Sequence, residues 1–314
     1  MTQSPRIAVI LPCYNEEAAV AATVRDFRAA LPQAAIYVYD NNSTDRTIEV
    51  AQAAGAIVRH EPLQGKGRVV RRMFADVEAD IYVMADGDAT YDAAAAPAMV
   101  ARLIDEQLDM VVGARASEVE AAYRRGHRLG NALLTGILAR IFGRTFSDIL
   151  SGYRIFSRRF VKSFPILSTG FEIETEISVH ALELRMPVAE IVTRYAARRE
   201  GSASKLSTYR DGWRILNTIM TLFRVERPVL FFGSIGGFLT ALAILLVAPL
   251  IVTFVRTGLV PRLPTAVLAT GLVIVGVLCF FTGLILDTVV RGRREVRRLA
   301  YLGLPALGGD ARSA

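Results

Sequence analysis

The chain has 314 residues, 52% of them hydrophobic, with a formal net charge of +7 and two cysteines. This length accommodates one large domain and an additional segment, and the apolar content is high for a soluble protein. Cys13 and Cys279 are too few and too far apart for a disulfide framework or a cysteine metal site. The positive charge fits anionic lipid head groups better than nucleic acid, because much of it is arginine beside apolar segments near the C-terminus.

Apolar segments alternate with amphipathic ones along the first 115 residues. The apolar segments, which we expect to be strands, cover residues 7–11, 36–39, 56–59, 81–85 and 110–113. Helices are expected from about Glu16, from Ser43, and over residues 66–78 and 94–106. This rhythm predicts an α/β fold with a mostly parallel sheet that is covered by helices on both faces.

Polar residues follow the expected strands at the edge where parallel sheets bind ligands. They are Pro12, Tyr14, Asn15 and Glu16 after the first strand, Asp40, Asn41 and Asn42 after the second, Asp86 and Asp88 after the fourth, and Arg115 after the fifth. Because the carboxyl ends of parallel strands share one edge, we expect these side chains to converge.

The tripeptide Asp86-Gly87-Asp88 sets two carboxylates at the tip of an apolar strand. Like charges this close repel each other unless a cation lies between them or one carboxyl is protonated. Carboxylate oxygens suit Mg²⁺ or Mn²⁺, which keep positions open for phosphate oxygens, and the glycine lets the turn close around the ion. A solvated turn at a strand end is the alternative interpretation.

The segment Gly65-Lys66-Gly67 lacks the wider pattern of a dinucleotide-binding or P-loop protein. The sequence contains no complete Gly-x-Gly-x-x-Gly motif after a strand and no Walker A motif. The segment instead predicts a helix N-terminus whose backbone amides approach a diphosphate.

Two apolar runs, residues 229–255 and 265–290, each exceed the roughly 20 residues that span a bilayer. Asp287, near the end of the second run, is the only charged residue in either. Arginines are denser outside the pair than between its members, so the positive-inside rule places both termini in the cytoplasm. No signal peptide is expected at the N-terminus, because charged residues come too early. Residues 207–227 predict an amphipathic helix at the membrane surface, with an ordinary core helix as the alternative.

Four segments in order, "VILPCYNEE", "YVYDNNSTDRT", "QGKG" and "MADGDATYD", resemble the nucleotide-sugar-binding half of family 2 glycosyltransferases. Further along, "SDILSGYRIFSRRFVKSF", "GFEIETEISVHALELRMPVAEI" and "RREGSASKLSTYRDG", followed by the apolar hairpin, resemble the polyprenyl-phosphate branch of that family, the dolichyl-phosphate mannose synthase type. The resemblance spans nearly the whole chain. It implies a GT-A type fold and an inverting transfer of one sugar from a nucleotide diphosphate to a lipid phosphate.

The resemblance also implies roles for single residues. The residues expected to bind the donor are Pro12, Tyr14, Glu16, Asp40, Lys66, Asp86, Arg199, Ser202 and Lys205. Asp86 and Asp88 would hold the metal, and the catalytic residues would be Asp148, Asp88 and Arg115. Arg115 and Arg154 would meet the acceptor phosphate. Tyr39 departs from the pattern, because many relatives carry a second aspartate there.

The expected organisation is a cytoplasmic catalytic domain (residues 1–206), a juxtamembrane helix (207–227), a two-helix membrane hairpin (228–291) and a basic cytoplasmic tail (292–314). The expected partners are a nucleotide sugar, a polyprenyl phosphate and membrane lipids, with Mg²⁺ or Mn²⁺ as cofactor and no nucleic acid. The sequence leaves a homo-oligomer possible.

Several donors and functions stay open at this stage. A UDP-hexose or UDP-N-acetylhexosamine is favoured over GDP-mannose as the donor. A polysaccharide synthase would share the donor site but carries a Gln-x-x-Arg-Trp sequence and more membrane helices. A non-enzymatic nucleotide-sugar sensor would not need Asp86, Asp88, Asp148 and Arg115 together.

Overall fold

The computed structural model describes residues 4–116, 136, 146–166, 168–170, 172–196, 217, 220–221 and 223–307. The chain forms two compact units. The first unit comprises Met1–Trp213 together with Arg297–Ala314, and the second comprises Arg214–Val296.

The first unit is built on a seven-stranded mixed sheet with the order β3-β2-β1-β4-β6-β5-β7. Its strands are β1 (Ile7–Cys13), β2 (Ala35–Asp40), β3 (Ile57–His60), β4 (Ile81–Met84), β5 (Met110–Ala116), β6 (Arg154–Ser157) and β7 (Val188–Arg194). β6 runs antiparallel between β4 and β5, and the other pairings among these strands are parallel. The predicted mostly parallel α/β sheet is therefore confirmed, with β6 and β7 added beyond the predicted strands.

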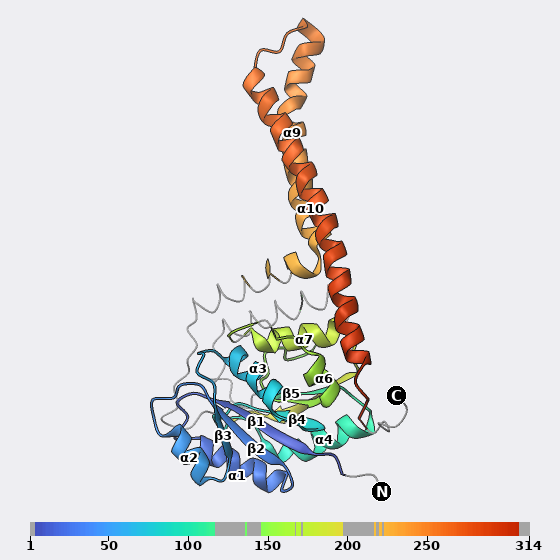
Figure 1. Cartoon of the computed structure of the whole chain (residues 1–314). Helices are drawn as coiled ribbons and strands as arrows, with labels where there is room; N and C mark the ends of the chain where they lie inside the picture. The colour runs from blue at the N-terminus through green and yellow to red at the C-terminus, as the bar shows by residue number, and fades with distance from the viewer. Residues whose placement is uncertain are drawn as a thin grey trace. The chain divides into compact units, whose positions relative to one another are not determined.

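Helices cover both faces of this sheet (Figure 1). One face carries α1 (Val20–Ala30), α2 (Thr47–Ala53), η1 (Ala93–Ala95) and α4 (Ala96–Asp105), and the other carries α3 (Lys66–Asp76), α6 (Arg158–Ser163) and α7 (Ile173–Glu183). Val20, Val24 and Phe27, spaced three or four residues apart, bury one stripe of α1 against the sheet. Each such side chain stabilises the fold by roughly 1.5–3 kcal/mol.

The C-terminal residues from Arg297 onward belong to the first unit and make buried polar contacts there. Arg297 Nη1 lies 2.6 Å from Glu183 Oε2 at the end of α7. The Tyr301 hydroxyl donates to Asp109 Oδ2 at 2.7 Å, and the Arg159 guanidinium lies 4.6 Å from the centre of the Tyr301 ring. Asp109 is fully buried and also pairs with Arg159 at 2.6 Å. Residues far apart in the sequence thus complete one fold.

The second unit contains most of two long helices, α9 (Pro228–Thr257) and α10 (Leu263–Leu302), and α10 ends within the first unit. Both are long and apolar enough to cross a membrane, and their most apolar windows are only 11% and 17% buried. A core helix of a soluble protein would be mostly buried, so these apolar faces require another apolar surrounding. α10 also continues past residue 291, where a basic tail was expected to begin. The predicted juxtamembrane helix over 207–227 lies mostly outside the described residues.

Candidate active site

Carboxylates from three strand ends gather around the thiol of Cys13. β1, β2 and β4 are parallel neighbours, and Cys13 is paired in register with Asp40. Burial raises the pKa of the Cys13 thiol well above its usual range, and the nearby charges of Glu16, Asp40, Asp86 and Asp88 raise it further. The structure therefore brings together four acidic residues that sequence analysis assigned to one edge.

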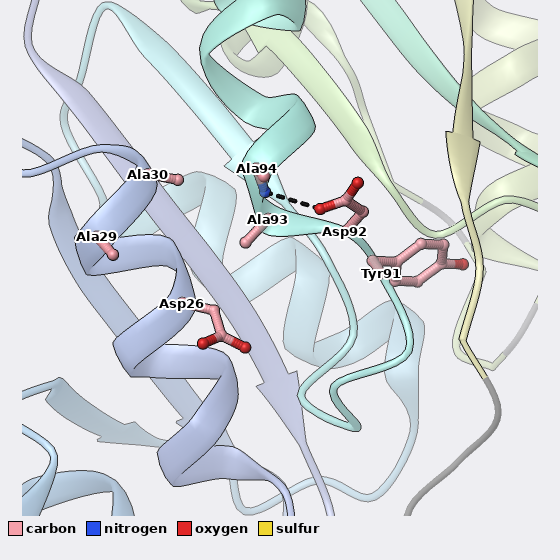
Figure 2. Close-up of a pocket in the computed structure, with 7 residues that line it drawn as sticks. All are labelled: Asp26, Ala29, Ala30, Tyr91, Asp92, Ala93 and Ala94. Atoms are coloured by element: carbon pink, nitrogen blue, oxygen red, sulfur yellow. Dashed lines mark hydrogen bonds between the residues drawn. The ribbon is translucent and has the colours of Figure 1, made fainter.

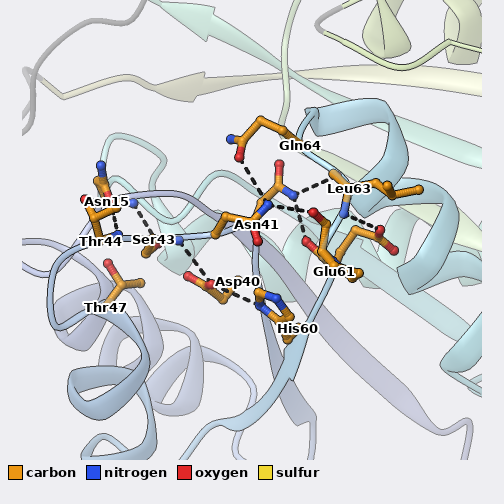
Figure 3. A network of polar contacts seen from close by, with 12 residues as sticks. Asn15, Asp40, Asn41, Ser43, Thr44, Thr47, His60, Glu61, Leu63 and Gln64 are labelled. Carbon is orange, nitrogen blue, oxygen red and sulfur yellow. Dashed lines mark hydrogen bonds and ion pairs between the residues drawn. The ribbon is translucent and has the colours of Figure 1, made fainter.

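Asp40 forms the centre of a polar network at one end of this edge (Figure 3). Its Oδ2 accepts a hydrogen bond from the Ser43 amide at 3.2 Å and lies 3.3 Å from His60 Nδ1. Its Oδ1 is buried without a hydrogen-bond partner among the described residues. An unpartnered buried acceptor costs free energy, so this oxygen is suited to an N–H donor of a bound ligand.

Asn41 fixes the loop that follows β3. Its amide nitrogen donates to the carbonyls of Glu61 and Leu63 at 2.9 Å each, and its Oδ1 accepts from the Gly65 amide at 2.7 Å. Figure 3 shows Asn41 beside Asp40, with Glu61 and Leu63 next to it. The network ties the end of β2 to the start of α3, where Lys66 lies.

The loop after β1 is joined to the loop after β2. The Asn15 amide donates to Ser43 Oγ and the Glu16 amide to Thr47 Oγ1, both at 2.8 Å. Glu16 is buried, and Pro12 and Tyr14 are half-buried. Tyr14 and Glu16, two of the residues assigned to the donor, thus lie on a loop fixed against the Asp40 loop, and Pro12 lies at the end of β1 just before it.

Lys66 is held between two carboxylates. Its ammonium lies 2.6 Å from Asp86 Oδ1 and 2.5 Å from Glu174 Oε1, and its side chain is 11% exposed. Burial alone lowers the pKa of this ammonium, but Asp86 and Glu174 outweigh it, so the net pKa is raised. Lys66 therefore carries a positive charge in the site.

The glycines on either side of Lys66 allow a close approach of two backbones. Gly65 has a φ of +137°, and a Cβ on it would overlap the carbonyl oxygen of Thr169. The Gly67 amide donates to the Gly170 carbonyl at 3.1 Å. The start of α3 therefore lies directly on the segment that leads into α7, which carries Glu174.

Asp86 and Asp88 present hard oxygen atoms in a narrow space. Asp88 is 2% exposed, and its Oδ1 accepts from Thr90 Oγ1 at 2.6 Å. A Cβ on Gly152 would lie 2.9 Å from Asp86 Oδ2, so the turn before β6 approaches this carboxylate closely. The described residues contain no group of three or more His, Cys, Asp or Glu side chains arranged for a metal. Two carboxylates fit a Mg²⁺ or Mn²⁺ that takes its other ligands from phosphate and water.

Arg115 and Asp148 form a second charged centre. Arg115 Nε lies 2.6 Å from Asp148 Oδ2, and Nη2 lies 2.8 Å from Oδ1. The Arg115 guanidinium also lies 5.4 Å from the centre of the Tyr195 ring. Glu190 accepts from the Ser147 amide at 2.8 Å and fixes the start of this turn.

Tyr91 links the two centres. Its hydroxyl accepts from the Gly152 amide at 2.8 Å, and its ring contacts those of Tyr153 and Tyr195. Burial raises the pKa of Tyr91, as does the charge of Asp86, whereas Arg115 and Lys66 lower it. Gly152 lies beside both the Tyr91 hydroxyl and Asp86, and Tyr195 contacts both the Tyr91 ring and Arg115, so the acidic edge and the Arg115–Asp148 pair lie next to each other.

Residues 8–164 match the family described as glycosyl transferase family 2. The chain belongs to this family. It is 33% identical to glycosyltransferase AglJ of Haloferax volcanii over 92% of this chain and 95% of that protein. It is 27% identical to the dolichyl-phosphate hexose transferase of the same organism, over 70% of this chain and 95% of that protein.

The fold of this glycosyltransferase is also similar to a solved structure. The glucosyl-3-phosphoglycerate synthase of Mycobacterium tuberculosis, in complex with Mn²⁺, UDP-glucose and phosphoglyceric acid, superposes with a TM-score of 0.58 at 24% identity. The match covers 70% of this chain and 79% of that one. The family resemblance and the GT-A type fold expected from the sequence are thereby confirmed.

Arg154 requires a correction, because this glycosyltransferase buries it completely. Its Nη2 donates to the Ile149 carbonyl at 2.5 Å, its Nε to the Ser151 carbonyl at 2.9 Å and its Nη1 to Ser178 Oγ at 2.9 Å. Burial lowers its pKa to about 10. The guanidinium thus holds the turn that carries Asp148 from inside the protein and is not exposed to an acceptor phosphate.

The site also contains four residues that the sequence did not predict, Tyr91, Glu174, Glu190 and Tyr195. Tyr91 stands within the quoted "MADGDATYD" segment, and that position was the feature of the sequence that could have pointed to it. Glu174 stands within the quoted "GFEIETEISVHALELRMPVAEI" segment and is buried in α7. The expected phosphate-binding residues Arg199, Ser202 and Lys205 lie outside the described residues.

A surface pocket of about 480 Å³ adjoins the site (Figure 2). It lies between α1 and η1 and is lined by Asp26, Ala29, Ala30, Tyr91, Asp92, Ala93 and Ala94. In Figure 2 the ring of Tyr91 lies at one end of the pocket, with its hydroxyl directed away from Asp26. Asp92 accepts from the Ala94 amide at 3.0 Å and so caps the helix beside the site.

Proposed function

We propose that this glycosyltransferase moves one sugar from a UDP-hexose or UDP-N-acetylhexosamine to a polyprenyl phosphate. The observation that carries the proposal is the joining of two charged centres by Tyr91. The carboxylates around Cys13, with Lys66, form one centre, and the Arg115–Asp148 pair forms the other. A nucleotide diphosphate and a phosphate acceptor need two such centres side by side.

The donor end would hold the nucleotide through residues of β1, β2 and α3. The unpartnered Asp40 Oδ1 provides an acceptor for a base N–H or a ribose hydroxyl, and Pro12, Tyr14 and Glu16 would line the nucleoside. Lys66 would meet the diphosphate as a charged donor. We also place Arg199, Ser202 and Lys205 on the phosphates, as the family resemblance implies.

The metal would be held by Asp86 and Asp88. A divalent ion bound there supplies stabilisation of the negative charge that develops on the departing diphosphate. Lys66 would add a second positive charge from the protein in a site where the flanking groups are buried.

The acceptor end would hold the lipid phosphate on Arg115. A phosphate monoester has a second pKa near ~6, so it is already largely a dianion at neutral pH and needs little help from a base. Its oxygen attacks C1 of the sugar opposite the diphosphate, the bond from C1 to the diphosphate oxygen breaks, and UDP leaves. Asp148 would hold Arg115 in place through two contacts rather than remove a proton.

Helices α9 and α10 would bring this site to its lipid. Their apolar side chains are mostly exposed, including Phe238, Leu245 and Val255, which fits contact with acyl chains. Arginines around Arg291 would then lie at the cytoplasmic head groups, with the catalytic residues and both termini on that side.

The test is transfer into an organic phase. The full chain in detergent would be incubated with a short polyprenyl phosphate, Mn²⁺ or Mg²⁺, and radiolabelled UDP- and GDP-sugars in turn. The proposal expects label from one UDP-sugar in the organic phase and none after chelation. Label from GDP-mannose alone would overturn the donor assignment, and donor binding without transfer would overturn the acceptor assignment.

A further inference from the structure

The ammonium of Lys66 contacts both Asp86, which is assigned to the metal, and Glu174, which has no assigned role. Asp86 Oδ1 lies 2.6 Å from Nζ, and Glu174 Oε1 lies 2.5 Å from it. The side chain of Glu174 is 6% exposed and that of Asp86 is 29% exposed. The lysine is thus a resident cation on one of the two carboxylates that would bind a divalent ion.

A divalent ion on Asp86 and an ammonium on the same carboxylate repel each other. The ammonium has a second position available, because Glu174 already contacts it from α7. The backbone of Lys66 is fixed between Gly65 and Gly67 against the Ser168–Gly170 segment, but its four-carbon stem can rotate. The Lys66 ammonium can therefore move from Asp86 toward Glu174 while the backbone of α3 stays in place.

We propose that Lys66 opposes metal binding at Asp86 until a diphosphate arrives, and that Glu174 is the positioning residue that receives the ammonium. This inference rests on the proposed function, because it takes Asp86 as a metal ligand and a nucleotide diphosphate as the donor. The diphosphate oxygens would give the displaced ammonium a further partner while Glu174 keeps its contact with it. The metal and the donor then bind cooperatively. The diphosphate draws the Lys66 ammonium away from the metal, and the metal neutralises the Asp86 charge that repels the diphosphate.

The test measures Mn²⁺ affinity directly, in the absence of any nucleotide. Free Mn²⁺ would be quantified by electron paramagnetic resonance during titration of the full chain in detergent. Lys66→Gln removes the opposing charge and is expected to tighten Mn²⁺ binding about tenfold, a typical coupling factor. Glu174→Gln leaves the ammonium on Asp86 and is expected to weaken Mn²⁺ binding about fivefold.

Two further variants separate this effect from damage to the fold. The double variant Lys66→Gln, Glu174→Gln replaces the buried charges with amides and is expected to bind Mn²⁺ as Lys66→Gln does. Lys162→Gln is the matched control, because Lys162 pairs with Glu78 and caps carbonyls at the other end of α3. It is expected to leave Mn²⁺ affinity unchanged.

The outcomes distinguish this inference from the proposed function. Mn²⁺ affinity in Lys66→Gln that equals or falls below that of the unmodified chain, while the unmodified chain binds Mn²⁺, overturns the role of Lys66 alone. A Glu174→Gln variant that binds Mn²⁺ as the unmodified chain does overturns the role of Glu174. No Mn²⁺ binding in any variant overturns the metal assignment and this inference with it, and the transfer assay then decides whether the proposed reaction stands.

Discussion

Arg115 and Asp148 meet through two nearly equal contacts, Nε to Oδ2 at 2.6 Å and Nη2 to Oδ1 at 2.8 Å. Such a fork fixes the plane of the guanidinium and makes the pair more directional than a single ion pair. Both side chains are mostly buried, at 14% and 8% exposure. An aspartate engaged in this way is better placed to orient the arginine than to accept a proton.

Asp148→Asn is the variant that distinguishes these roles. Asparagine keeps one oxygen for Arg115 but cannot act as a base, so we expect about a tenfold loss of kcat, a higher KM for polyprenyl phosphate and an unchanged pH profile. Steady-state kinetics from pH 6.5 to 8.5 would measure all three. A loss beyond about a thousandfold with unchanged KM would assign Asp148 as the base.

Asp88→Asn tests the metal assignment. The asparagine side chain can still accept from Thr90 but loses the charge that would bind a divalent ion. We expect at least about a hundredfold loss of metal-dependent turnover, with an unchanged melting temperature. Asp92→Asn, four residues later, is the control, since Asp92 caps η1 and is not assigned to the metal. Near-normal activity in Asp88→Asn would exclude Asp88 as a metal ligand.

The sequence predicted the parts of the fold that depend on local pattern. The strands that became β1 to β5 read as apolar runs followed by polar residues, because parallel strands are buried on both faces and ligands bind at their ends. It did not predict β6 or β7. β6 covers only Arg154–Ser157 and pairs antiparallel with its neighbours. It is too short to show a strand pattern in the sequence, and it does not follow the alternation of strand and helix that predicted the other strands.

The sequence predicted the parts of the candidate site in which neighbouring residues already indicate the chemistry. Asp86 and Asp88 stand out because two like charges at a strand tip need a cation. Arg154 was misassigned because its burial depends on α7, which comes later in the chain and contributes Ser178. Glu174 was missed for the same reason, since its contact with Lys66 joins α3 to α7 across 108 residues. Such pairings depend on tertiary packing and produce no regular spacing in the sequence from which they could be predicted.

Arg154→Lys tests the structural role of that buried cation. A lysine keeps the charge but cannot donate in a fork to the Ile149 and Ser151 carbonyls, so those carbonyls lose buried partners. We expect a loss of roughly 2–4 kcal/mol in stability. Arg158→Lys, at a more exposed position, should change stability by less than about 0.5 kcal/mol. Thermal unfolding in detergent measures both. Unchanged stability in Arg154→Lys with a raised KM for polyprenyl phosphate would restore the phosphate-binding role.

His180 should make the catalytic unit sensitive to acid. Burial among Phe160 and Phe164, aided by the charge of Arg297, lowers the pKa of His180 to about 3. In the unfolded chain this histidine takes up a proton as the pH falls below about 6.5, whereas in the folded chain it stays neutral. The free energy of unfolding therefore decreases as the pH drops from about 6.5 toward 3. The slope approaches about 1.4 kcal/mol per pH unit.

His180→Leu removes this group while filling a similar volume. Its stability should fall less steeply than that of the unmodified chain between pH 7 and pH 5, as judged by melting temperature in detergent. At pH 7.5 the two should differ far less. Parallel curves for the two chains across this range would contradict the assignment of a buried neutral histidine.

The α9–α10 pair depends on close contact at Gly236. A Cβ there would lie 2.6 Å from the Gly276 carbonyl oxygen, whereas a Cβ on Gly237 would meet nothing within 4 Å. We expect Gly236→Leu to destabilise the hairpin by about 1–3 kcal/mol and Gly237→Leu to change it little. Melting of the two variants in the same detergent provides the comparison. Equal melting temperatures would contradict the packing of these helices.

We propose that one sugar moves to a lipid phosphate and that UDP leaves. The most direct measurement is the mass of the organic-phase product, together with the amounts of UDP and UMP released from the same reaction. We predict one hexose or N-acetylhexosamine joined to polyprenyl phosphate, with one UDP released for each lipid product. A product with two phosphates and release of UMP, or UDP release without any sugar on the lipid, would contradict the account.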